Sequence, residues 1–180
     1  MKNVFKKAIK LFDKQEVVII SRNGDEYGII CGYFGLRMPA ATYDLYFRPE
    51  KPYYVQLEDR QTWKSYKNTR KSSVGELSPD YMDVDKLFPV DATAAKITPF
   101  LYEIDGRTAR VFAGDDLIIA NDAFVEAFVD VFGTEYIYSA GRIKPLLWQD
   151  GMQPVASGVL LPVNAQLPEP VRDAILAEYR

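Results

Sequence analysis

Residues 121–139, "NDAFVEAFVDVFGTEYIYS", contain the pattern that decides the fold. Apolar side chains recur in its first twelve residues with the 3.6-residue period of an amphipathic helix. Asn121 or Asp122 is suited to cap that helix, and Gly133 is suited to end it in the left-handed conformation. A short β-rich run, "EYIYS", follows. The stretch therefore predicts a helix that leads directly into a strand.

The N-terminal stretch 3–21, "NVFKKAIKLFDKQEVVIIS", has the same pattern. The apolar positions 4, 5, 8, 9, 11 and 12 of this first helix correspond to positions 124, 125, 128, 129, 131 and 132 of the second. All amphipathic helices share this period, so chance agreement between two of them is an alternative explanation. The β run that follows each helix favours a structural duplication of a helix-plus-strands unit.

Turn signals between the helices predict antiparallel hairpins. Asn23-Gly24 and Asp105-Gly106 each stand between two β-rich runs, and both dipeptides favour a tight hairpin turn. The stretches 41–49, "ATYDLYFRP", and 53–63, "YYVQLEDRQTW", are interpreted as further strands. We expect one α+β domain over residues 1–180, with antiparallel hairpins packed against two main helices. Its expected parts are half-units 1–63 and 86–164, a loop or insertion at 64–85, and a short C-terminal helix at 168–180.

Composition narrows the classes of function. The 180 residues are 48% hydrophobic and 26% charged, as in ordinary folded proteins, and the net charge is −3. There is no histidine, and Cys31 is the single cysteine, so the usual catalytic base, disulfides and multi-cysteine zinc sites are excluded. The N-terminus does not resemble a signal peptide, and no stretch is long and apolar enough to span a membrane. We expect a cytoplasmic protein without membrane contact, cofactor or metal.

A basic window at 60–73, "RQTWKSYKNTRKSS", stands out in this acidic chain. Its cations, its two aromatic side chains and the lysines on the outer side of the first helix are candidates for binding nucleic acid, because phosphates need cations and bases stack on exposed rings. The candidates are Lys6, Lys10, Trp63, Lys64, Tyr66, Lys67, Arg70 and Lys71. The alternative is a solvated loop in which Trp63 closes the preceding strand against the core.

Three stretches resemble one domain of a sliding clamp, the ring-shaped DNA polymerase processivity factor. They are "SPDYMDVDKLFP" (78–89), "NDAFVEAFVDVF" (121–132) and "KPLLWQDGMQPVASGVLLPV" (144–163). The resemblance implies two helix-plus-strands units related by a pseudo-twofold axis, a DNA or replication-protein partner, and assembly into a homo-oligomer. It also implies a peptide pocket lined partly by Leu161, Pro162 and Val163. This chain departs from the family in its acidic second helix and in the tail helix after Asn164.

Catalytic signatures are weak in this sequence. Asp80, Asp83 and Asp85 could offer oxygen ligands to magnesium, but their spacing lacks the glycine and the distal glutamate of a calcium-binding loop, and a solvated turn is the simpler interpretation. We therefore expect a non-catalytic binding or assembly protein, a clamp-like accessory factor that contacts DNA or replication proteins. The alternatives are a small interaction or inhibitor protein of a mobile element, and an enzyme acting through carboxylates.

Overall fold

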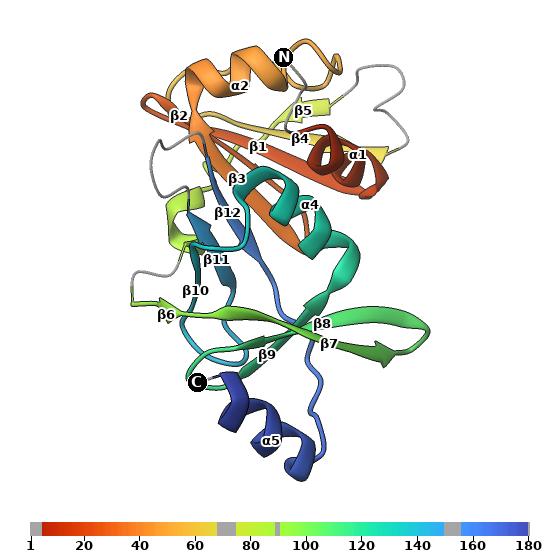
Figure 1. Cartoon of the computed structure of the whole chain (residues 1–180). Coiled ribbons are helices and arrows are strands. Elements are labelled where there is room, and N and C mark those ends of the chain that lie inside the picture. Colours follow the sequence, from red (N-terminus) through yellow and green to blue (C-terminus); the bar gives the residue numbers. More distant parts are fainter. Residues whose placement is uncertain (1–4, 68–74, 89–90, 150–155, 180) are drawn as a thin grey trace.

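The computed structural model describes residues 5–67, 75–88, 91–149 and 156–179, which form two antiparallel sheets with helices packed against them (Figure 1). The helices are α1 (Lys6–Lys14), α2 (Ala40–Tyr46), η1 (a 3₁₀ turn, Val84–Leu87), α4 (Asp122–Phe132) and α5 (Glu169–Tyr179). The strands are β1 (Val17–Asn23), β2 (Glu26–Ile30), β3 (Phe34–Pro39), β4 (Thr62–Tyr66), β5 (Gly75–Leu77), β6 (Thr93–Ala94), β7 (Lys96–Ile104), β8 (Arg107–Ala113), β9 (Leu117–Asn121), β10 (Ile137–Ser139), β11 (Leu146–Gln149) and β12 (Ser157–Leu160). The predicted α+β class is confirmed.

The larger sheet has a symmetric strand order. It runs β5-β4-β1-β2-β3-β12-β11-β10-β6, so that β3, β2 and β1 extend to one side of the β3–β12 pair and β12, β11 and β10 extend to the other. β1 follows α1 along the chain, and β10 follows α4. This is the order that two helix-plus-strands units joined at their third strands would give. The half-unit limits 1–63 and 86–164 stay a prediction, because strand order does not fix them.

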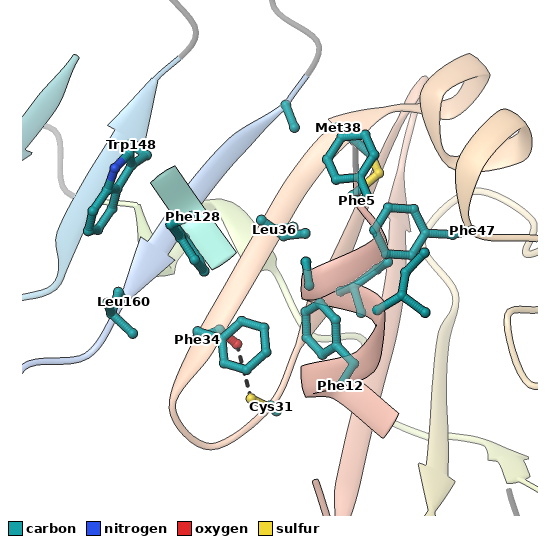
Figure 2. Close-up of a cluster of buried hydrophobic side chains, with 14 of the residues drawn as sticks. Phe5, Phe12, Cys31, Phe34, Leu36, Met38, Phe47, Phe128, Trp148 and Leu160 are labelled. Carbon is teal, nitrogen blue, oxygen red and sulfur yellow. Dashed lines mark hydrogen bonds between the residues drawn. The ribbon is translucent and has the colours of Figure 1, made fainter. Parts of the chain in front are cut away.

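Both main helices cover the same face of this sheet and share one core (Figure 2). Phe34 of β3 lies at its centre: the ring centroids of Phe12 and Phe34 are 4.4 Å apart, and those of Phe34 and Phe124 are 5.1 Å apart. Phe128 of α4 packs in turn against Trp148 of β11, with centroids 5.1 Å apart. Burial of these rings provides most of the stabilisation of the two amphipathic helices, because short helices are marginally stable without tertiary packing.

The opposite face of the large sheet is covered by η1. Val84 packs over Gly28, where an added Cβ would collide with the Val84 side chain. Asp83 caps the turn by accepting from the amide of Asp85, and the Asp85 carboxylate accepts from Arg37 Nη1 at 2.8 Å. These carboxylates therefore have structural partners, and no acidic or cysteine cluster within the described residues is arranged to hold a metal ion.

The predicted strand at 41–49 is wrong. Residues 40–46 form α2 instead, because Tyr43 and Phe47 lie four residues apart and both bury against the core. Of the strand expected at 53–63, only the last two residues form a strand, because β4 begins at Thr62. Residues 64–85, expected as a loop, contain the end of β4, all of β5 and the start of η1, elements too short to produce a detectable period. The first hairpin turns at Gly24 and Asp25, one residue later than predicted.

A smaller sheet, β7-β8-β9, lies beside the lower half of the large one in the view of Figure 1. Its β7–β8 hairpin turns at Asp105 and Gly106, both with positive φ, as the sequence predicts. α5 packs on one side of this sheet, within the range predicted for the C-terminal helix. Within the described part of the chain, no helix is long and apolar enough to cross a membrane.

Candidate protein-binding pocket

A pocket of about 520 Å³ lies where the chain leaves β12, beside the β2–β3 turn and the start of α4. Its lining residues are Tyr33, Ile104, Asp105, Arg107, Thr108, Ala109, Asn121, Phe124, Pro162 and Val163. Pro162 and Val163 are thus brought into one concave site, as the peptide-pocket hypothesis requires. Leu161 does not line this pocket and is 45% exposed beside it.

Two backbone hydrogen bonds fix the segment that carries Pro162 and Val163. The amide of Leu161 donates to the carbonyl of Tyr33 at 2.9 Å, and the amide of Val163 donates to the carbonyl of Ile119 at 2.7 Å. The segment therefore continues alongside β9 after it has left β12. Its side chains form one wall of the pocket.

An aromatic pair also lines the pocket. The rings of Tyr33 and Phe124 stack at a centroid distance of 5.9 Å and an interplanar angle of 25°. Phe124 is half-buried against the core, whereas Tyr33 is 55% exposed. A stacked pair that is anchored on one side and open on the other is suited to receive an apolar side chain.

The rim of the pocket is polar. Asp105 and Arg107 flank it from the β7–β8 turn, and Asn121 lies at the start of α4, where its side-chain oxygen accepts from the amide of Ala123 at 3.1 Å. Next to it, Arg110 Nε donates to Asp122 at 2.6 Å, and this hydrogen bond raises the pKa of Arg110. A mostly apolar lining with a few polar groups is typical of sites that bind peptides or small molecules.

The nucleic-acid candidates do not gather on one face. Trp63 pairs with Ile20, on the face of the sheet that α1 covers, whereas Lys64 pairs with Ile19 and therefore points to the opposite face. Lys6 and Lys10 are exposed on α1. The sheet thus separates the helix lysines from Lys64.

The remaining residues of the basic window have varied surroundings. Trp63 is half-buried and packs against the core, as in the alternative interpretation of the window. Tyr66 is 39% exposed, and its hydroxyl donates to Glu76 at 3.0 Å, a hydrogen bond that raises the pKa of Tyr66. Lys67 is exposed, and its amide donates to the carbonyl of Glu16. Arg70 and Lys71 lie outside the described residues.

The helix layer carries charges of both signs. Lys7 of α1 pairs with Asp130 of α4 at 2.9 Å, and this hydrogen bond raises the pKa of Lys7. Glu126 is exposed on α4, one turn before Asp130. A phosphate backbone laid across both helices would therefore meet anions on α4 as well as cations on α1.

Several pocket residues carry no signal in the sequence. Tyr33, Ile104, Arg107 and Phe124 come from a turn, a strand end, a strand start and a helix start. Each is ordinary in its own element, and only the folded chain brings them together. The helical period predicts only that Phe124 faces the core, and its side chain does pack against the core in addition to lining the pocket.

Comparison with solved structures identifies several similar chains. The chain is similar to DNA polymerase III subunit beta from Borrelia burgdorferi, at a TM-score of 0.45 and 11% identity over 92% of this chain and 62% of the other. It is also similar to a putative DNA polymerase III beta subunit from Eubacterium rectale, at 0.45 and 10% over 91% and 64%. The corresponding values for the DNA polymerase sliding clamp from Bacillus subtilis are 0.42 and 10% over 91% and 63%.

The chain thus spans less than two thirds of the length of these clamp chains. They are the kind of protein that the three sequence stretches resemble. No protein-family model matches the sequence, and no curated protein is similar to it.

Proposed function

We propose that this chain is a binding protein that holds a short peptide segment of a partner in the pocket between Tyr33, Phe124, Pro162 and Val163. The observation that carries the proposal is the pocket itself: a stacked aromatic pair and a segment held by two backbone hydrogen bonds line the same concave site. At about 520 Å³ the pocket has room for one or two apolar side chains. Its polar rim would accept the backbone of the same segment.

The class of partner follows from the sequence resemblance. Residues 144–163 resemble the closing hairpin of a sliding-clamp domain, and the pocket forms where that hairpin ends. We therefore propose a replication protein as the partner and a clamp-like, non-catalytic accessory role for this chain. A protein of a mobile element that inhibits another protein would use the same pocket, so the partner's identity distinguishes these two roles.

Selection of binders from a displayed library of random peptides tests the proposal. The immobilised full chain is the bait, and peptides are selected on the wild-type protein alone, without counter-selection on any variant. Peptides that survive are labelled with fluorescein, and their affinity is measured by fluorescence polarisation. We expect enrichment of peptides with at least one large apolar side chain.

Val163→Asp places an unpaired charge in an apolar wall, and we expect it to weaken binding by at least about tenfold, the effect of a typical hot-spot residue. Leu45→Asp is the matched control, because Leu45 is an exposed apolar residue on α2 and does not line the pocket. A library that yields no binder, or binders that tolerate Val163→Asp as well as Leu45→Asp, would refute the proposal. Thermal unfolding of both variants establishes that they are folded.

A nucleic-acid role is a second proposal, supported by the exposed lysines of α1. The sheet separates these lysines from Lys64, so two charge-reversal variants test the two surfaces independently. Lys6→Glu with Lys10→Glu should weaken binding of single- or double-stranded DNA and flatten its dependence on salt, whereas Lys64→Glu should not. Absence of DNA affinity at low salt would dismiss the proposal.

A further inference from the structure

The segment between β12 and α5 joins the proposed pocket to the C-terminal helix. Residues 161–168, all of them described, run without helix or strand. Pro162 and Val163 at the start of the segment line the pocket, whereas Ala165 and Leu167 at its end pack against the cluster that contains α5. One short stretch of chain therefore belongs to both structures.

α5 is held to the small sheet by few side chains. Ile175 and Leu176 are its buried residues, and they pack in a cluster with Val111, Leu117 and Ile119 of β8 and β9. Most other positions of α5 are exposed. Tyr179 packs at the edge of the same cluster, with its ring centroid 6.1 Å from that of Phe100 on β7. A helix docked through three apolar side chains has few contacts to lose when it undocks, and such elements open at low free energy.

Polar contacts also hold the segment and α5 to the rest of the protein, around a smaller cavity of about 280 Å³. Arg172 of α5 approaches Asp116 at 3.3 Å. When the amide of Gln166 is oriented with its oxygen toward Arg142, that oxygen accepts from both terminal guanidinium nitrogens, at 3.1 and 3.2 Å. These ties connect the end of the segment to the body of the protein at the point where α5 begins.

We propose that α5 is a clasp for the pocket: its docking holds the wall formed by Pro162 and Val163, so that peptide binding and α5 docking favour each other. The backbone hydrogen bonds donated by Leu161, Val163 and Ala165 do not offset the conformational entropy of ordering the whole segment, because each contributes less than the backbone entropy lost over several residues. The rest of the stabilisation comes from Ala165, Leu167 and the buried side chains of α5. This coupling rests on the proposed peptide-binding function, and it is reciprocal by thermodynamic necessity.

Amide hydrogen exchange of the unliganded full chain, followed by mass spectrometry, tests the clasp without any ligand. In the double variant Ile175→Ala, Leu176→Ala, we expect exchange in residues 161–167 to accelerate at least about tenfold, because released α5 no longer holds the segment. Asp173→Asn, at an exposed position of α5, is the matched control and should leave exchange unchanged. Unchanged protection of 161–167 in a double variant whose α5 exchanges freely would overturn the inference.

The reciprocal measurement uses wild-type protein and therefore does not depend on a variant that folds. The probe is an unlabelled peptide that was selected from the library and whose binding requires Val163. At saturation it should slow exchange of the α5 amides at least about fivefold, and the double variant should bind it at least about fivefold more weakly.

These results separate the two proposals. A peptide that requires Val163 but leaves α5 exchange unchanged refutes the clasp and supports the pocket. A library without any pocket-dependent peptide refutes the proposed function and the coupling with it. Accelerated exchange of the segment in the unliganded double variant would then still support α5 as its structural anchor.

Discussion

Substitution of Gly158 by alanine tests how α4 is seated on the large sheet. Gly158 lies on β12, directly under the helix, where an added Cβ would collide most closely with Phe128 Cε1 and would lie 2.7 Å from Phe132 Cε2 and 2.8 Å from Phe128 Cδ1. Ordinary carbon–carbon contacts are about 3.5–4.0 Å, so the ring of Phe132 would have to move by roughly 1 Å and that of Phe128 by more than roughly 1 Å. Phe128 has little freedom to move, because it is wedged between Trp148 and Phe34.

Overpacking of this kind costs about 1–3 kcal/mol. Loss of a glycine also restricts the unfolded chain, which stabilises the native state by about 0.4–1 kcal/mol. We therefore expect Gly158→Ala to lower the free energy of unfolding by about 1–2 kcal/mol. For a domain of this size the corresponding fall in Tm is about 2–8 °C.

Urea denaturation followed by tryptophan fluorescence measures this loss, because Trp148 is buried beside Phe128. Gly32→Ala is the matched control: an added Cβ there meets nothing within 4 Å, and its stability should be unchanged or slightly raised. Phe128→Leu combined with Gly158→Ala should be less destabilising than the sum of the single changes, since the smaller side chain yields room. If Gly158→Ala is as stable as Gly32→Ala, the helix does not lie on β12 as described.

Three further results are expected. Trp148→Ala should lower the free energy of unfolding by about 3–5 kcal/mol in chemical denaturation, because it leaves a cavity where the fully buried indole ring packs. Burial raises the pKa of Tyr43 and of Tyr54, so stability that is present below about pH 10 should be lost as the pH rises, and tyrosinate absorbance should report both rings only on unfolding. Lys7→Ala should lower the free energy of unfolding only slightly, and this loss should vanish at high salt, because the side chains of Lys7 and Asp130 are exposed to water and salt. The double variant Lys7→Asp, Asp130→Lys should restore the stability, because it forms the same ion pair with its charges exchanged.

The parts of the fold that follow one periodicity could be predicted from the sequence. Both main helices, the hairpin at Asp105-Gly106 and the C-terminal helix appear close to their expected positions. α2 could not be predicted, because the aromatic residues of 41–49 satisfy a two-residue alternation as well as a helical spacing. Only the core decides between them, by burying Tyr43 and Phe47 together.

The candidate site was predictable only where a motif pointed to it. The resemblance of the closing hairpin points to Leu161, Pro162 and Val163, of which Pro162 and Val163 line the pocket and Leu161 does not. Tyr33 and Arg107 were not, because their contribution depends on tertiary neighbours far away in the sequence. Trp63 shows the reverse case: composition placed it in a nucleic-acid site, whereas its strand register turns it toward the core.

The β3–β12 pair, at which the two halves of the large sheet meet, also constrains the order in which this chain can fold. β3 acquires its second neighbour only when Phe34 pairs with Leu160 and Arg37 pairs with Ser157. On the ribosome, the hairpins formed by β1, β2 and β3 can form early, but the free edge of β3 stays open until β12 has been synthesised. Closure of the sheet is therefore a late event that joins distant segments, and we expect slow folding and a nascent chain that depends on protection of that edge.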